Sequence, residues 1–154
     1  MKSKKILLFS LSIFMLLFLT GCGNKKAITK EDFIAKAEKH NYQIVDATSQ
    51  FEQYDEIESA TLALSPDNWQ VEFYELNTSE NAMAMFEHNK SKFEDYKDNT
   101  ALEASKSMSN YATYSLTSGG YYMYLSTVDN TLIYLRVKDT YKDTVKDFIK
   151  ELAY

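Results

Sequence analysis

The sequence is poor in the residues that form cross-links, tight turns and most catalytic sites. It contains one cysteine, one proline, four glycines and two histidines among 154 residues. A single cysteine excludes an intramolecular disulfide, so the stability of the fold must come from its core. The scarcity of proline and glycine argues against a disordered or low-complexity chain. Arginine is also rare, since Arg136 is the only one.

Motifs for nucleophilic, zinc-dependent or phosphate-binding chemistry are absent from the sequence. It holds no Gly-x-Ser-x-Gly, no His-Glu-x-x-His and no glycine-rich phosphate loop. We expect His40 at the C-terminal end of a helix, where a cation suits the helix dipole, and His88 on the charged side of another helix. The acidic segment 46–58 lacks the spacing of a calcium-binding loop. The sequence therefore predicts no metal, no cofactor and no enzymatic activity.

The first 21 residues have the three-part layout of a secretory signal. Three lysines precede an apolar run at residues 6–19, and small residues follow it before Cys22. At 1.5 Å per residue, a helical run of this length covers about 21 Å of a hydrocarbon core that is roughly 30 Å thick. The run is therefore too short for a comfortable permanent span.

The four residues Leu19-Thr20-Gly21-Cys22 resemble the lipobox of bacterial lipoproteins. The resemblance implies that the signal peptide is removed before Cys22 and that the thiol of Cys22 carries the lipid. It places the mature protein on the outer side of the cytoplasmic membrane. Two other interpretations stay open: a secreted protein cleaved elsewhere with a free Cys22, or a signal anchor that is not cut.

We divide the chain into a signal peptide at 1–21, a lipidated cysteine with a short tether at 22–28, and a single globular domain at 29–154. From Cys22 onward the chain keeps 14 basic and 22 acidic residues, because the signal peptide removes three lysines and no acids. A net side-chain charge of −8 repels phosphodiester backbones and anionic headgroups. We therefore expect no nucleic-acid partner and a membrane attachment that relies on the acyl chains.

Apolar periodicity predicts an α+β domain. Thr29 and Thr78 or Ser79 are candidate N-caps. We expect an antiparallel sheet of about five to seven strands, with two or three helices mainly on one face, in the order α-β-ββ-α-β-β-β-α. The polar segment 46–58 is expected as a loop or a short helical turn. The predicted helices cover residues 30–40, 79–96 and 140–152. The predicted strands cover residues 42–45, 60–64, 69–76, 110–116, 121–128 and 131–138, with a less certain one at 103–108.

Two turn signals, Gly119-Gly120 and Asp129-Asn130, set the register of the last strands. Two-residue turns at these places bring one set of side chains to one face: Tyr114, Leu116, Tyr121, Met123, Leu125, Tyr134 and Arg136. Because tyrosine and arginine favour interfaces, this face is our candidate binding surface. The residues that we assign to it are Tyr114, Tyr121, Met123, Tyr134 and Arg136. The alternative is that these tyrosines are good strand formers whose rings belong to the core.

The last third of the chain, in which residues 129–134 lead into an amphipathic helix, resembles small lipoproteins of low-GC Gram-positive bacteria. This resemblance supports the interpretation as a lipoprotein and implies no site residues. We expect a lipid-anchored module that binds a protein or a small ligand at the cell envelope. Two alternatives stay open: an envelope enzyme or enzyme accessory that uses carboxylates, and an inhibitor or immunity-type lipoprotein that binds a basic partner.

Overall fold

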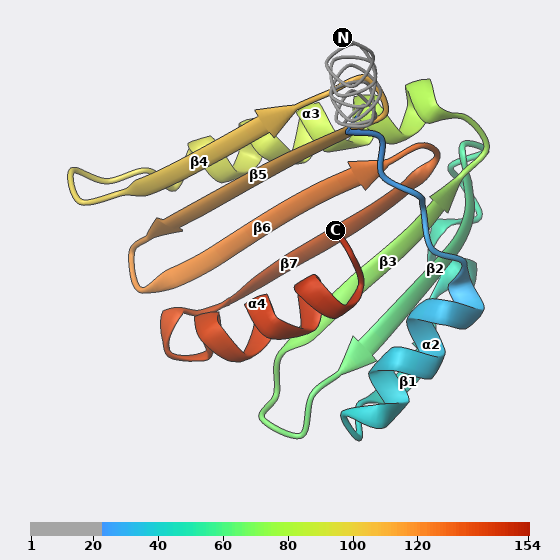
Figure 1. The fold of residues 1–154 in the computed structure, drawn as a ribbon, viewed down its shortest axis with the longest axis horizontal. Coiled ribbons are helices and arrows are strands. Elements are labelled where there is room, and N and C mark those ends of the chain that lie inside the picture. Colours follow the sequence, from blue (N-terminus) through green and yellow to red (C-terminus); the bar gives the residue numbers. More distant parts are fainter. Residues whose placement is uncertain (1–22) are drawn as a thin grey trace, which may run out of the picture.

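A computed structural model describes residues 23–154 as one seven-stranded sheet with three α-helices. The expected lipid attachment at Cys22 and the signal peptide lie outside these residues. All neighbouring strands pair antiparallel, in the spatial order β1-β2-β3-β7-β6-β5-β4 (Figure 1). The strands are β1 (Gln43–Asp46), β2 (Ile57–Leu64), β3 (Gln70–Leu76), β4 (Leu102–Ser107), β5 (Tyr111–Ser118), β6 (Tyr121–Val128) and β7 (Thr131–Lys138). The predicted α+β class and antiparallel sheet are confirmed.

The helices begin close to the predicted residues. Helix α2 (Lys30–Lys39) starts after Thr29, whose side chain accepts a hydrogen bond from the backbone N–H of Asp32. Helix α3 (Ser79–Glu94) starts after Thr78, which caps it in the same way. Helix α4 (Lys142–Glu151) follows a short 3₁₀ turn, η3 (Asp139–Tyr141), where the sequence predicted one continuous helix. The polar segment after β1 forms the 3₁₀ turn η2 (Thr48–Phe51), which agrees with the prediction of a short helical turn.

Helices cover both faces of the sheet (Figure 1). Helices α2 and α4 share one face, which we call the α2/α4 face, and α3 lies on the other, the α3 face. Phe33, Phe73 and Phe148 are fully buried on the α2/α4 face. On the α3 face, Phe86 and Phe93 of α3 pack against a cluster of strand residues: Tyr114, Leu116, Met123 and Leu125. The expectation that helices gather mainly on one face thus describes two of the three helices.

Positive backbone φ angles occur at the turns where the sequence predicted them. Gly119 and Gly120 have φ of 57° and 80°, and Asp129 has φ of 51°. These turns give the register that the sequence predicted, with Leu125 opposite Tyr134 and Met123 opposite Arg136. The side chains that line each face of strands β5 to β7 were therefore predictable from two dipeptides.

The segment between the expected lipid-attachment residue and α2 is packed against the domain. Asn110 receives a hydrogen bond from the backbone N–H of Lys25 at 3.2 Å and donates one to the carbonyl oxygen of Lys25 at 2.7 Å. Ala27 and Ile28 pack against the core of the α2/α4 face. In residues 23–154, no helix is long and apolar enough to cross a membrane.

Candidate ligand-binding groove

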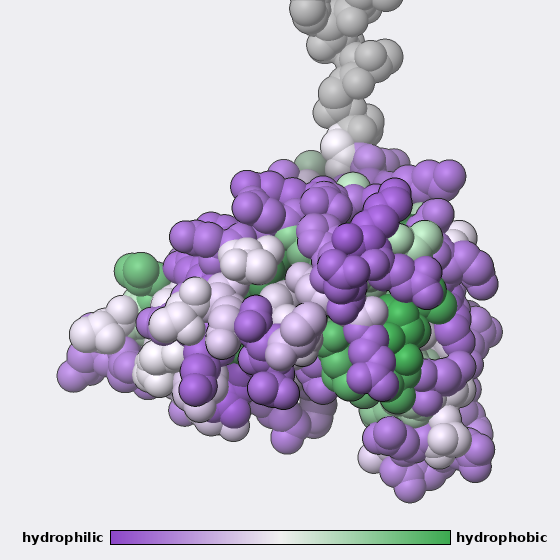
Figure 2. All heavy atoms as spheres, turned by 90° about the horizontal axis from the view of Figure 1, so that it is seen from below, coloured by the Kyte–Doolittle hydropathy of each residue, from purple (hydrophilic) through white to green (hydrophobic). Residues whose placement is uncertain are grey.

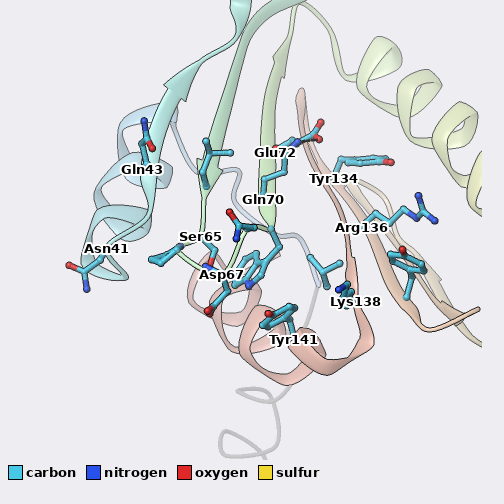
Figure 3. A pocket seen from close by; sticks show the side chains of 16 residues that line it. Asn41, Gln43, Ser65, Asp67, Gln70, Glu72, Tyr134, Arg136, Lys138 and Tyr141 are labelled. Carbon is cyan, nitrogen blue, oxygen red and sulfur yellow. Dashed lines mark hydrogen bonds between the residues drawn. The ribbon is translucent and has the colours of Figure 1, made fainter.

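Helix α3 leaves one end of its sheet face open, and this end forms a groove of about 1080 Å³. The groove lies between the turn that joins β2 to β3 and the adjoining ends of β6 and β7 (Figure 3). Seen from below, the molecule has a notch in its outline and exposes hydrophobic surface beside it (Figure 2). The lining mixes aromatic, polar and charged side chains. The lining includes Gln70, Glu72, Tyr121, Tyr134, Arg136 and Lys138.

Arg136 lies close to two tyrosine rings at one side of this groove. Its guanidinium carbon lies 4.2 Å from the ring centre of Tyr121 and 4.6 Å from that of Tyr96. Both distances are within the range of a cation–π contact, which does not use the N–H donors of the guanidinium. Among the ion pairs of residues 23–154, none involves Arg136. The N–H donors of this cation are therefore available to an acceptor that residues 23–154 do not supply.

Glu72 stands on the neighbouring strand β3, opposite Tyr134 of β7. Its carboxylate accepts a hydrogen bond from Gln70 Nε2 at 2.7 Å and another from the hydroxyl of Tyr74. Burial raises the pKa of Tyr134, and the charge of Glu72 adds to this effect while Arg136 opposes it. The groove thus carries a negative group on β3 and a cation on β7, with a tyrosine between them (Figure 3).

A hydrogen-bonded loop places Tyr96 over Arg136. Ser118, at the end of β5, donates to the carbonyl oxygen of Tyr96 at 2.7 Å and accepts from the backbone N–H of Asp98 at 3.0 Å. The carboxylate of Asp98 accepts from the backbone N–H of Gly119 at 3.0 Å and from that of Thr100 at 2.8 Å. The hydroxyl of Thr100 also donates to this carboxylate at 2.8 Å, and this bond, followed by the two from the backbone, lowers the pKa of Asp98 to about 2. The loop after α3 is therefore tied to the β5–β6 turn.

The structure divides the face that the sequence proposed for binding. Tyr121, Tyr134 and Arg136 line the groove. Tyr114 and Met123 are fully buried beneath α3 and belong to the core, so their assignment to a binding surface was wrong. The reason is that α3 crosses the part of the face where these two residues lie. Cys22 lies outside the described residues.

Sequence reasoning missed two residues: Tyr96, which contacts Arg136, and Glu72, which lines the groove. Tyr96 is half exposed and reaches Arg136 only through the fold, because it follows a helix and lies 40 positions away in the chain. Glu72 was placed correctly on an alternating strand, but nothing in the sequence indicated that β3 pairs with β7. The one signal that the sequence offered was the position of Tyr96 directly after an amphipathic helix, where a side chain is expected to be exposed and not in the core.

Neither histidine lies in the groove. His40 caps α2 as predicted, and its Nε2 lies 3.0 Å from Glu151 Oε2. His88 is exposed on α3, beside a smaller hollow of about 470 Å³ between α3 and the η2 segment. Within residues 23–154, no group of three or more histidine, cysteine, aspartate or glutamate side chains is arranged to hold a metal ion.

Comparisons with known proteins give a distant similarity of fold. No protein-family model matches the chain, and no curated protein matches it. A solved structure described as a GTP binding regulator from Thermotoga maritima is 16% identical, with 84% of this chain and 87% of that chain covered and a TM-score of 0.48. We draw no family and no function from a similarity at this level.

Proposed function

We propose that this protein is a lipid-anchored binding module of the cell envelope, and that its groove takes a ligand with an anionic group. The observation that carries the proposal is the guanidinium of Arg136, which lies in cation–π range of Tyr96 and Tyr121 and pairs with no carboxylate of residues 23–154. Carboxylate and phosphate groups suit the edge of an arginine, because two N–H groups can bind two oxygens at once. The membrane attachment rests on the sequence around Cys22.

The remainder of the groove favours a ligand that continues away from its anionic group. Leu64 and Trp69 supply apolar surface near the β2–β3 turn, while Gln70 and Glu72 supply hydrogen-bonding groups along β3. A peptide with a free carboxyl group combines an anionic end with an amide backbone and side chains. We therefore take a carboxyl-bearing peptide as the ligand class to test first.

A basic partner protein is a weaker candidate for this groove. The net charge of −8 from Cys22 onward favours such a partner in general. The groove, however, is lined by Arg136 and Lys138 as well as by Asp67 and Glu72, so its acidic and basic side chains balance and it does not share the negative charge of the whole chain. An inhibitor or immunity-type protein would have to use a different surface.

The proposal can be tested by NMR on the mature chain with Cys22→Ser, because Arg136 is the only arginine. Its Nε–H group gives the single arginine side-chain signal of a ¹⁵N spectrum. We expect short peptides with a free carboxyl terminus to shift this signal, and the same peptides with an amidated terminus to leave it in place. Arg136→Gln lacks this signal, so the backbone amide signals of the groove residues are compared in the variant and the wild type as the control for non-specific binding. Equal shifts from both peptides, or shifts confined to residues outside the groove, would contradict the proposal.

A further inference from the structure

The chain enters the domain at the end of the sheet that lies far from the groove. Beside the Lys25–Asn110 contacts, Ser109 donates to the side-chain oxygen of Asn24 at 2.7 Å. Gly23 lies against Met108, since a Cβ built on Gly23 would be 3.7 Å from the methyl carbon of Met108. Gly23, the first residue that the structure describes, is therefore held against the β4–β5 turn, and in the sequence it directly follows Cys22.

The surface around this entry point is basic and partly apolar. Met108 is 46% exposed. The ammonium groups of Lys25 and Lys106 lie 5.1 Å and 5.2 Å from the ring centre of Tyr111, so two cations contact the same aromatic ring. Lys26 is exposed beside them. We call these four residues, Lys25, Lys26, Lys106 and Met108, the anchor rim.

The charges facing the anchor rim are few. Asp129 lies in the adjacent β6–β7 turn, where its carboxylate accepts a hydrogen bond from Asn110 Nδ2 at 3.1 Å. Burial lowers the pKa of Lys25, and the neighbouring charge of Lys106 contributes in the same direction. A chain with 22 acidic and 14 basic residues from Cys22 onward thus places three lysines beside the residue that is expected to carry its lipid.

The groove lies at the opposite end of the strands. Strand β6 runs from Tyr121, which lines the groove, to Val128, which is paired with Tyr111 beside the anchor rim. Eight residues of extended chain span about 26 Å at roughly 3.3 Å per residue. The groove is also on the α3 face, whereas Tyr111 belongs to the core of the α2/α4 face.

We propose that the anchor rim rests on anionic phospholipid headgroups, so that the groove faces away from the membrane. This inference rests on the lipid anchor of the proposed function. The lysines contact the phosphates, and Met108 enters the boundary between headgroups and acyl chains. The docked segment 23–28 transmits this orientation to the whole domain, because its hydrogen bonds leave no flexible linker.

The orientation can be measured on the purified, lipidated full-length mature protein in vesicles. Because the thiol of Cys22 is used by the lipid, an introduced cysteine is the only site for a nitroxide label. Ser107→Cys places the label beside the anchor rim, and Asp67→Cys places it in the β2–β3 turn, which lines the groove. Vesicles of phosphatidylcholine with phosphatidylglycerol are compared with vesicles of phosphatidylcholine alone. The readout is the collision rate of each label with a water-soluble nickel chelate.

On anionic vesicles we expect the label at 107 to be protected from the chelate and the label at 67 to stay accessible. The triple variant Lys25→Gln, Lys26→Gln, Lys106→Gln should lose this protection, with the docked population falling by roughly fivefold for each lysine removed. A matched triple variant, Lys92→Gln, Lys97→Gln, Lys146→Gln, should keep it. Equal exposure of both labels in protein that floats with the vesicles would overturn the orientation while leaving the anchor intact. Protein that carries no acyl group and does not float would overturn the anchor itself.

Discussion

At the scale of single residues, Arg136 shows how a charged side chain can be restricted in position while its hydrogen-bond donors stay unpaired. Two tyrosine rings restrict its guanidinium, at 4.2 Å and 4.6 Å, without using its hydrogen-bond donors. An ion pair would restrict it equally well but would occupy those donors. An arginine whose side chain is already restricted by ring contacts therefore loses less conformational entropy on binding an anion than a freely mobile arginine does.

Arg136→Gln should lower the free energy of unfolding by about 1 to 2 kcal/mol, because both ring contacts are lost at a partly exposed site. Arg136→Lys keeps the charge but loses the planar stack, so it should recover only part of this stability and little of the peptide binding. Chemical denaturation followed by circular dichroism measures the first effect, and the NMR titration measures the second. A glutamine variant as stable as the wild type would show that the stack is incidental.

The two tyrosines Tyr114 and Tyr121 should respond differently to truncation, although both belong to the face that the sequence grouped together. Tyr114 is fully buried under α3, so Tyr114→Ala should destabilise the protein by about 3 to 5 kcal/mol. Tyr121 is half-buried at the groove, and Tyr121→Ala should cost well under half of that while weakening ligand binding. Urea denaturation of the two variants checks the order, and the reverse order would refute the division of this face.

At the scale of elements, the position of α3 decides which part of the sheet is open. The sequence predicted the turns, the strand register and the caps, because each depends on residues close in the chain. It could not predict the face that α3 covers, since both sheet faces carry apolar side chains and the link from β3 to α3 is only residues 77–78. The register of the candidate face therefore followed from local turns, whereas the exposure of its residues depended on where α3 packs.

The loop between α3 and β4 should control the position of Tyr96 against Arg136. Ser118→Ala removes the hydrogen bonds to Tyr96 and Asp98 and should cost about 1 to 3 kcal/mol, because Ser118 is buried. Amide hydrogen exchange should then rise at residues 96–100 while the exchange of β6 and β7 stays slow. Ser115→Ala, at a half-buried position of the same strand, is the matched control. Unchanged exchange in the loop would contradict its positioning role.

Asp98 should give the same loop a dependence on pH. Its pKa is lowered from an ordinary value of 3.8 to about 2, so its contribution to stability is complete above the ordinary value and is lost as the pH falls towards about 2. Asp98→Asn removes this titration. As the pH falls from 3.8 towards about 2, the melting temperature should decrease more steeply for the wild type than for Asp98→Asn. Parallel decreases in the two proteins would contradict the role assigned to Asp98.

At the scale of the whole molecule, the two ends of the sheet have separate roles in our account. One end receives the chain beside the anchor rim, and the other carries the groove. The attachment itself is tested by metabolic labelling with radioactive palmitate, in which the wild-type protein should be labelled and Cys22→Ala should not. Label on the alanine variant, or none on the wild type, would contradict the expected lipoprotein.

The claim that the groove binds a ligand in the envelope is tested most directly by photo-cross-linking in living cells of the source organism. A benzoylphenylalanine residue is placed at Lys138, which lines the groove, and in a second strain at Lys146, which is exposed on α4. We predict an adduct from position 138 that disappears when Arg136→Gln is added, and none from position 146. Equal adducts at both positions, or an adduct at 138 that survives the loss of Arg136, would contradict the account.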